Sequence, residues 1–409
     1  MKIKENNRVV HVVGDSILRS CGFSQQVFIE TRELKRQGYE VFVLAFCHIK
    51  YFLNKVLIEK VREQYRKEGI NICIVPTFLF GKLLLEVLYL PVAWALLSYL
   101  IVFKRVKIFH VHSKIYTLML LPLKFVMPIR IINDNHGVTI EEGIYRDEIK
   151  SGSILYHYAN FKEKLAMKYA NFNLCVSQKM IDYYTNKHTL SLSHFTITRS
   201  SFDPDIFKYF SYDQKEQAKK LLGLHDKKVL LYMGHKQSWQ QISEIVELYA
   251  EFKKYIPHLF IIFLTNDIVG VRENFQRIKV PDSEYMVKYV AHEEVPLYSY
   301  SADVAIIMRS DSIVNHVSSP VKFSEYLASG ASVLISPTIG DLPSLVKKYN
   351  IGVVLSSDGM DSAISYFNDV FESKERQKLS AEKCREVAEK EFSVKNTIDI
   401  FKKCYEKIT

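Results

Sequence analysis

Residues 9–44, VVHVVGDSILRSCGFSQQVFIETRELKRQGYEVFVL, contain one complete repeat of a parallel α/β fold. The first five residues predict a strand. Apolar side chains then recur at helical spacing over residues 25–37, and Gly38 follows as a helix stop. A second strand is predicted at residues 40–44. Because a helix between two short strands is the usual connection in a parallel sheet, this stretch indicates helices packed over parallel strands.

The same alternation continues along the chain and restarts in its second half. Turn-forming residues at 200–205 separate the halves, and 409 residues exceed one ordinary core. We therefore predict an α/β protein of two Rossmann-like domains facing each other across a cleft, with ligands beyond the carboxyl ends of the strands. The predicted domains are 1–205 and 206–390, and 391–409 form a C-terminal helix that returns to the first domain. Further strands are expected at 70–76, 108–112, 130–133, 174–177, 195–198, 228–233, 259–265, 284–289, 304–308, 332–335 and 352–355.

The composition predicts a packed globular protein with a basic surface. Apolar residues make up 48% of the chain, charged residues 24%, and the formal net charge is +10. This charge favours acidic partners such as nucleotide phosphates or anionic lipid headgroups, although a solvated lysine surface explains it equally well. No motif of the aromatic and basic kind used by nucleic-acid-binding modules occurs, so nucleic acid is not expected as a partner.

The amino terminus and the cysteines favour a cytoplasmic protein. Residues 1–8 lack the apolar run and cleavage site of a signal peptide, and the six cysteines are widely spaced, as buried thiols in a reducing compartment are. Residues 83–103 are long and apolar enough to span a bilayer, yet Pro91 and the basic residues that follow favour a buried or interfacial helix. Peripheral contact with the cytoplasmic face of a membrane therefore stays open.

Residues 318–330, SSPVKFSEYLASG, carry the strongest indication of chemistry. They predict a loop, a helix with Pro320 near its first turn, and then a strand. The first amides of a helix lack intrahelical partners and attract anions, and Lys322 adds a cation at that end. Glu325, one helical turn further on, offers a carboxylate that can accept both hydroxyls of a ribose. An exposed Lys–Glu pair on a capped helix is the alternative interpretation.

This segment resembles the donor-site signature of GT4-type retaining glycosyltransferases. The resemblance implies the GT-B fold, a nucleoside-diphosphate sugar as donor, and transfer with retention to a glycan or lipid-linked acceptor, as in bacterial surface polysaccharide synthesis. It implies that Glu325 holds the donor ribose, that Lys322 assists departure of the diphosphate, and that Ser318 and Ser319 lie beside it. No cofactor and no metal are expected, because helix amides and basic side chains neutralise the leaving diphosphate. Val317 replaces the second Glu of the family, which leaves the donor sugar open.

The loop after the strand at 228–233 occupies the place where the family clamps the donor pyrophosphate with an Arg and a Lys. Gly234, His235 and Lys236 are the candidates here, with Lys236 as the phosphate clamp. Gln240 stands in place of the lysine in the family's Lys-Gly pair. The alternative is a polar turn at the end of a strand.

Residues at the ends of other predicted strands complete the candidate site. Gly22, in the first strand-to-helix loop, permits backbone amides to approach an anion closely. His136 follows a strand and, as the resemblance implies, lies over the transferred sugar as a catalytic residue. Glu141 and Glu142 are candidate acceptor contacts or merely first-turn acids of a helix. Arg309 ends a strand and is a candidate for the phosphate or the base, or a surface arginine.

Other functions also fit these residues. Sugar-nucleotide 2-epimerases share the architecture and need no acceptor, and Val317 and Gln240 suit a nucleotide-sugar binding protein that has lost catalysis. His110 and His112 resemble a metal-binding pair, but alternation along a strand accounts for them, and no third ligand is near in sequence.

Overall fold

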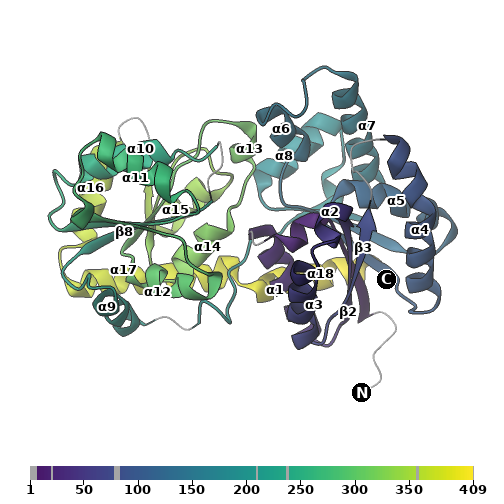
Figure 1. Cartoon of the computed structure of the whole chain (residues 1–409), viewed down its shortest axis with the longest axis horizontal. Coiled ribbons are helices and arrows are strands. Elements are labelled where there is room, and N and C mark those ends of the chain that lie inside the picture. The colour runs from purple at the N-terminus through teal and green to yellow at the C-terminus, as the bar shows by residue number, and fades with distance from the viewer. Residues whose placement is uncertain are drawn as a thin grey trace. The chain divides into compact units, whose positions relative to one another are not determined.

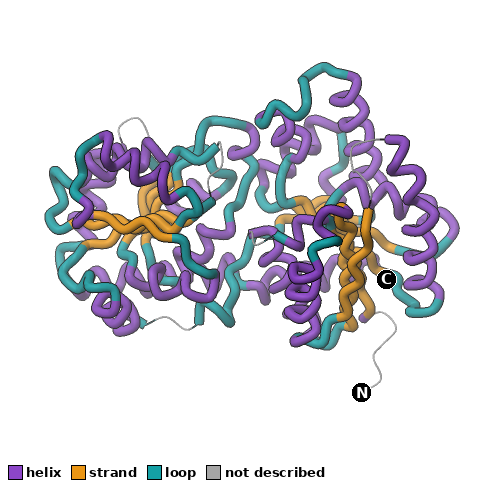
Figure 2. Tube along the Cα trace, in the orientation of Figure 1, coloured by secondary structure: helices purple, strands orange, loops and turns teal. Residues whose placement is uncertain are grey.

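The chain divides into two α/β units, one of residues 1–199 with 394–409 and one of residues 200–393. In each unit a parallel sheet lies between two layers of helices (Figures 1 and 2). This is the doubly wound architecture that the sequence predicts. The computed structural model describes residues 7–19, 22–77, 83–208, 211–235, 239–355 and 359–408.

The first unit contains, in the part of the chain that is described, a seven-stranded parallel sheet. Its strand order is β3-β2-β1-β4-β5-β6-β7, so the order reverses between β1 and β4. At such a reversal the loops beyond the carboxyl ends diverge and leave room for a ligand. The strands are β1 (Arg8–Val13), β2 (Glu40–His48), β3 (Asn71–Thr77), β4 (Ile108–Val111), β5 (Arg130–Asn135), β6 (Phe172–Cys175) and β7 (Phe195–Ile197).

Alternate residues of β1 pack on opposite faces of this sheet. Val9 and Val13 join the core beneath α1, α3 and α18, whereas Val10 and Val12 join the core beneath α4 and α5. Both faces of β1 thus carry buried apolar side chains, as is usual in a parallel sheet covered by helices on both sides. The helices are α1 (Gly22–Arg36), α2 (Ile49–Phe52), α3 (Lys55–Lys67), α4 (Leu83–Val102), α5 (Lys114–Val126), α6 (Thr139–Tyr145), α7 (Ile154–Tyr169), α8 (Gln178–His188) and α18 (Val394–Ile408), with short 3₁₀ turns η2 (Asp15–Leu18) and η3 (Leu192–His194).

The C-terminal helix α18 packs on the first unit, as predicted. Ile398, Phe401 and Tyr405 follow helical spacing and are buried in the same core as α1. The hydroxyl of Tyr405 lies 2.8 Å from Nδ1 of His110, so α18 also contacts a polar side chain of β4.

The apolar segment predicted at 83–103 forms helix α4. Ala93 and Leu97 are buried, and Nε1 of Trp94 donates a hydrogen bond of 2.8 Å to the carbonyl oxygen of Met119 on α5. The described part of α4 is thus held against the first unit. Among the described residues, none of the helices combines the length and apolar character needed to cross a bilayer.

The second unit has a six-stranded parallel sheet of order β10-β9-β8-β11-β12-β13 within its described residues. Val229 and Leu231 face α12, α14 and α17, whereas Leu230 and Tyr232 face α10, α11 and α16. Its strands are β8 (Lys228–Met233), β9 (Leu259–Leu264), β10 (Tyr285–Lys288), β11 (Val304–Ile307), β12 (Ser332–Ile335) and β13 (Gly352–Val354). Its helices are α9 (Tyr212–Leu221), α10 (Ile242–Phe252), α11 (Ile268–Arg277), α12 (Val295–Ser301), α13 (Ile313–His316), α14 (Val321–Ala328), α15 (Leu342–Tyr349), α16 (Gly359–Val370) and α17 (Lys374–Phe392), with 3₁₀ turns η4 (Asp282–Glu284) and η5 (His292–Glu294).

One helix is shorter than its sequence pattern suggests. Periodicity predicts a helix over 238–255, but α10 covers only Ile242–Phe252. Residues 253–256 continue as turns, Pro257 then lacks an amide for a helical hydrogen bond, and His258 adopts a left-handed φ of 61°. Apolar spacing continues past the helix because Ile256 still packs in the core.

Candidate functional site

At the carboxyl ends of β8 and β11, polar groups of the second unit surround the ammonium group of Lys322. Lys322 projects from the first turn of α14, and its Nζ donates a hydrogen bond of 3.2 Å to Oε1 of Gln240. The same Nζ lies 4.8 Å from the ring centroid of Tyr232, whose hydroxyl also hydrogen-bonds Gln240. Gln240 therefore positions Lys322. The sequence indicated this glutamine only as the replacement of a lysine, and gave no signal for Tyr232.

Gly234 allows the ammonium group to come close to the backbone. A Cβ atom at Gly234 would lie 2.7 Å from Nζ of Lys322 and 2.9 Å from Oε1 of Gln240. Side chains in a packed interior do not approach so closely, so any larger residue would displace Lys322. The structure thus brings together two of the predicted donor residues, Gly234 and Lys322.

A second cation, Arg309, lies beside them. It follows β11 and forms an isolated antiparallel bridge with Gln240. Its guanidinium group donates a hydrogen bond of 3.2 Å to Oδ1 of Asn315, while its Nε is buried with no hydrogen-bond partner among the described residues. Arg309 is therefore not a freely solvated surface arginine but a cation with unused donor capacity.

Two basic side chains, Lys322 and Arg309, lie near one acidic side chain, Glu325. Burial, and then the charge of Arg309, lower the pKa of Lys322 well below its ordinary value, against the opposing effect of Glu325. The carboxylate of Glu325 is thus the acidic group that opposes the effects of burial and Arg309 on Lys322. Since burial and Arg309 disfavour the charged form of Lys322, a bound anion such as a diphosphate would favour that form.

Glu325, the predicted ribose ligand, contacts a histidine that the sequence did not single out. Nε2 of His292 lies 3.4 Å from Oε1 of Glu325. Burial lowers the pKa of His292, but the hydrogen bond and charge of Glu325, together with the charges of Asp203 and Glu293, raise that pKa overall. The imidazole consequently holds the carboxylate in one orientation, with 12% of the Glu325 side chain exposed.

The loop before α14 uses its polar groups mainly within the second unit. The hydroxyl of Ser318 donates to the carbonyl oxygen of Asn315 at 2.9 Å, and the Ser319 carbonyl accepts a 2.7 Å hydrogen bond from Ser200. The side chain of Val317 is buried and faces the core. Ser318 and Ser319 therefore lie at the start of α14, as predicted, while the position of the missing Glu offers no polar side chain.

The other predicted donor residues have different surroundings. The carbonyl oxygen of His235 accepts a hydrogen bond of 3.0 Å from Nε2 of Gln240. His235 is exposed, and its ring centroid lies 6.4 Å from that of Tyr289. Gly22 is the first residue of α1 in the first unit. Lys236 lies outside the described residues.

In the first unit, strands β1, β4 and β5 bring four histidines and an aspartate together. Nε2 of His136 lies 3.0 Å from Nδ1 of His112, whose Nε2 lies 2.9 Å from Nδ1 of His11. Nε2 of His110 lies 3.0 Å from Oδ2 of Asp134. His11, Asp134 and His136 are distant in sequence from His110 and His112 but lie beside them in the fold. The sequence alone gave His110 and His112 no further partner. Only the strand order β1-β4-β5 reveals this cluster.

Burial sets the protonation of the cluster. It lowers the pKa values of His11, His112 and His136, so these imidazoles are neutral at neutral pH. Burial by itself would raise the pKa of Asp134, but His136 and His110 lower it overall. The cluster therefore contains an ionised carboxylate beside the neutral rings of His11, His112 and His136.

Two groups in this cluster have the spacing of metal ligands. His11, His110 and His112 form one, and His112, Asp134 and His136 form the other. Both ring nitrogens of His112 already contact other imidazoles at hydrogen-bonding distance. A metal ion would have to break one of those bonds, so hydrogen bonding alone accounts for the spacing.

The two predicted acceptor acids differ in their surroundings. Glu141 is buried, accepts a hydrogen bond of 2.7 Å from Lys187, and is also hydrogen-bonded by Tyr183. Glu142 is partly exposed and its carboxylate lies against Gly137, next to His136. Burial raises the pKa of Glu142. Glu142 is therefore the acid whose carboxylate contacts the loop that carries His136.

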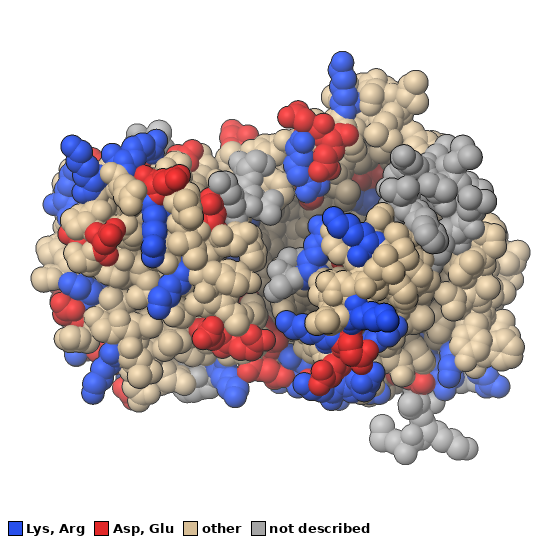
Figure 3. All heavy atoms as spheres, viewed as in Figure 1, with Lys and Arg blue, Asp and Glu red and all other residues tan. Residues whose placement is uncertain are grey.

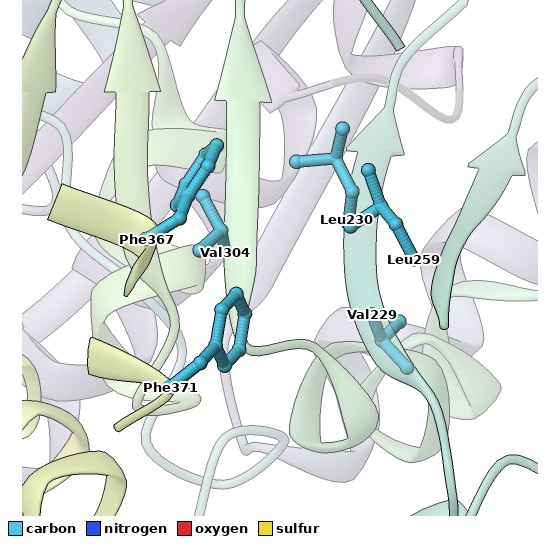
Figure 4. Close-up of a pocket in the computed structure, with 6 residues that line it drawn as sticks. All are labelled: Val229, Leu230, Leu259, Val304, Phe367 and Phe371. Atoms are coloured by element: carbon cyan, nitrogen blue, oxygen red, sulfur yellow. The ribbon is translucent and has the colours of Figure 1, made fainter. Parts of the chain in front are cut away.

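A hollow in the second unit lies elsewhere. Val229, Leu230, Leu259, Val304, Phe367 and Phe371 line it (Figure 4). The first four belong to the beginnings of β8, β9 and β11, the edge opposite Lys322. Its lining is entirely apolar, so this hollow lacks the groups that would bind a nucleotide.

Solved structures share the whole architecture of this chain. HepE from Anabaena in complex with UDP has a TM-score of 0.71 at 10% identity, covering 98% of this chain and 100% of its own. A glycosyltransferase from Rickettsia africae gives 0.72 at 15% identity, covering 98% of both chains. WaaG, a glycosyltransferase involved in lipopolysaccharide biosynthesis, gives 0.65 at 13%, covering 98% and 99%. No protein-family model and no curated protein sequence matches the chain.

These similarities establish the fold class. The two Rossmann-like units, with seven-stranded and six-stranded sheets in their described parts, form the GT-B fold of glycosyltransferases.

Proposed function

We propose that this chain is a glycosyltransferase that moves a sugar from a nucleoside-diphosphate sugar to a glycan or lipid-linked acceptor. The observation that carries the proposal is the placement of two basic side chains, Lys322 and Arg309, around Gln240 at the carboxyl ends of β8 and β11, with Glu325 one helical turn beyond Lys322. In the proposed complex the diphosphate contacts both cations and the first turn of α14, and Glu325 accepts hydrogen bonds from the ribose hydroxyls. The GT-B fold supports this assignment.

In the proposed reaction the bond between the anomeric carbon and the diphosphate oxygen breaks while the acceptor hydroxyl forms a new bond to that carbon. The acceptor proton passes to the departing diphosphate, and Lys322 and Arg309 stabilise the negative charge that develops there. The resemblance to GT4-type enzymes supports retention of configuration, a role for His136 at the transferred sugar, and no requirement for a metal. It also supports a place in bacterial surface polysaccharide synthesis.

The proposal is tested with a panel of nucleotide sugars. The correct donor should raise the unfolding temperature of the wild type by mass action, and Glu325→Ala should abolish the shift. Incubation with that donor and a lipid-linked or glycan acceptor should then release the nucleoside diphosphate and yield a new glycoside. If the wild type and Glu325→Ala bind UDP and GDP equally and neither releases them from any donor, the chain is not a glycosyltransferase.

Val317 and Gln240 favour one second candidate, a nucleotide-sugar binding protein without transfer activity. The buried Val317 supplies no polar contact to the sugar, and Gln240 replaces a cation. Donor binding without release of nucleotide would identify this case. Conversion of the donor sugar to its 2-epimer in the absence of acceptor would identify an epimerase.

We also propose peripheral membrane contact through the start of α7. Ile154, Leu155, Tyr158 and Phe161 are exposed there at helical spacing, and Nζ of Lys162 lies 4.6 Å from the ring centroid of Tyr158. Exposed apolar side chains with adjacent lysines suit a headgroup boundary. Over the face shown in Figure 3, the described basic side chains are interspersed with acidic ones.

Flotation with vesicles tests this contact. The wild type should float with vesicles containing anionic lipid, and Ile154→Ser with Phe161→Ser should prevent flotation. Leu379→Ser, at an exposed position on α17, is the matched control. Equal flotation of all three proteins, or none of the wild type, would contradict the proposal.

A further inference from the structure

Three imidazole rings of the first unit form a continuous line of hydrogen bonds. Nδ1 of His11 on β1 lies 2.9 Å from Nε2 of His112, which directly follows β4. Nδ1 of His112 lies 3.0 Å from Nε2 of His136, which directly follows β5. Because β1, β4 and β5 are neighbours, the line crosses three strands, from a fully buried ring to a side chain that is 19% exposed.

The number of protons restricts how these rings can bond. Three neutral imidazoles have six ring nitrogens and three protons. Each of the two nitrogen–nitrogen contacts uses one proton, because a hydrogen bond needs one donor and one acceptor. The third proton must therefore lie at one end of the line, on Nε2 of His11 or on Nδ1 of His136. Its position fixes the tautomers of all three rings.

The two ends have different surroundings. Nε2 of His11 is buried and has no hydrogen-bond partner among the described residues. A proton there would create an unpaired buried N–H group, which folded proteins almost always avoid, whereas unused acceptors are tolerated more often. The ring of His136 is partly exposed, so a proton on its outer nitrogen can bond to water or to a ligand. The geometry favours the proton at His136.

Asp134 lies nearer to His110 than to the rings of the line, and its Oδ2 is 3.7 Å from Nδ1 of His112. The Tyr405 hydroxyl lies 2.8 Å from Nδ1 of His110, and Nε2 of His110 lies 3.0 Å from Oδ2 of Asp134. Since an ionised carboxylate only accepts, Nε2 of His110 donates to Asp134. Nε2 of His136 is 3.5 Å from the same oxygen, farther than from His112.

We propose that His11 and His112 are positioning residues that fix His136 in its Nδ1-protonated form, so that His136 offers a hydrogen-bond donor to an oxygen atom of its ligand. Nε2 of His136 accepts the hydrogen bond from His112. The outer nitrogen consequently cannot serve as a base without reversal of the whole line. Its ligand atom is an acceptor, such as a hydroxyl oxygen of a sugar. The assignment of the ligand atom to a sugar rests on the proposed function, whereas the tautomer of His136 does not.

The tautomer is measured directly by long-range ¹H–¹⁵N correlation NMR of the full chain labelled at histidine, with no ligand present. We expect His136 and His112 to carry their protons on Nδ1 at neutral pH. In His112→Leu, which removes the donor to His136, we expect His136 to change to the Nε2-protonated form and donate to Asp134. His112→Asn retains an N–H group near the position of Nδ1 and should restore the wild-type tautomer. Unchanged signals of His188 and His292 verify that each variant is folded.

A second measurement connects the tautomer to catalysis. With an active donor and acceptor, His112→Leu should lower kcat at least tenfold, and His112→Asn should recover most of that loss. A wild-type His136 protonated on Nε2, or a tautomer that is the same in His112→Leu, would overturn the proposal. So would stoichiometric binding of added Zn²⁺ that shifts the signals of His112 and His136, because metal bonds would then replace the hydrogen bonds. If the tautomers are as expected but no transfer occurs, only the proposed function fails.

Discussion

Nζ of Lys322 and Oε1 of Gln240 lie 3.2 Å apart, so the central cation of the candidate donor site is positioned by a neutral amide. An amide oxygen accepts a hydrogen bond without cancelling the charge of the ammonium group. A bound anion near Lys322 and Arg309 would therefore meet two basic groups whose charges no contact with Gln240 cancels. The replacement of the family's lysine by Gln240 is therefore compatible with a two-cation site built from other positions.

Removing the ammonium group of Lys322 should weaken nucleotide binding without lowering the free energy of unfolding. We expect Lys322→Met to weaken the binding of the matching nucleoside diphosphate about 10- to 100-fold, because a hydrogen bond to a charged group contributes about 1.5–3 kcal/mol. The free energy of unfolding should stay the same or rise, because an incompletely paired cation is lost from a partly buried place. Calorimetric titration and denaturant unfolding measure the two effects. Lys347→Met, on the exposed side of α15, serves as the control; equal nucleotide affinity in both variants would exclude Lys322 from the site.

A methyl group at position 234 should weaken nucleotide binding because it displaces Lys322. In Gly234→Ala the new Cβ would meet the ammonium group, so the lysine must move away from Gln240. We expect a loss of nucleotide affinity approaching that of Lys322→Met. In the double variant the second substitution should add little, since coupled residues are not additive. Fully additive losses of affinity would show that Gly234 acts independently of the lysine.

The contact between His292 and Glu325 should make stability depend on pH. The folded-state pKa of His292 is raised, so its contribution is fully present below the unfolded pKa of about 6.5 and is lost as the pH rises through the folded pKa. Glu325→Gln removes the charge that raises the pKa. The difference in unfolding free energy between wild type and Glu325→Gln should therefore be larger at pH 6 than at pH 8.5. A difference that is independent of pH would mean that His292 is not held by Glu325.

The histidine line should have the opposite pH dependence. The folded-state pKa values of His11, His112 and His136 are lowered, so the unfolded chain takes up protons first as the pH falls. Stability should be complete above about pH 6.5 and decrease below it, by up to about 1.4 kcal/mol per pH unit for each histidine. Asp134 contributes no slope there, because its lowered pKa matters only below about pH 4. Denaturant unfolding between pH 7 and 5.5 of His292→Asn, with and without His112→Leu, measures the part of the slope that belongs to the line, and equal slopes would contradict it.

The packing of α18 predicts a large effect of one substitution. Phe401 is fully buried in the core of the first unit. We expect Phe401→Ala to reduce the free energy of unfolding by about 3–5 kcal/mol, because it leaves a cavity between α18 and its neighbours. Asp399→Ala, on the exposed side of the same helix, should change it by less than about 0.5 kcal/mol. Hydrogen exchange should place the loss in the first unit.

The repeated strand and helix pattern was sufficient to predict the fold. Apolar runs such as 228–233 and 304–308 are strands because both faces of a parallel sheet are buried, which gives a strong signal in sequence. Lys322 and Glu325 were predicted as a pair because one helical turn determines their spacing. Local periodicity thus carries information about elements and about neighbours within an element.

Local periodicity could not predict contacts between residues of different helices, strands and loops. Gln240 meets Lys322, and His292 meets Glu325, only because loops from different strands converge at one edge of the sheet. The line from His11 to His136 depends on the strand order, which alternation in sequence does not specify. Glu141 shows the converse, since nothing in its sequence surroundings indicated that Lys187 would bind its carboxylate.

The return of α18 to the first unit affects the order in which the protein is made. The second unit is one uninterrupted segment, residues 200–393, whereas the first combines residues 1–199 with residues 394–409. A ribosome therefore completes the second unit before it makes the helix that covers the core of the first. Until then the apolar surface beneath α18 stays open to solvent and to chaperones. The part of the molecule synthesised first is thus the last to finish folding.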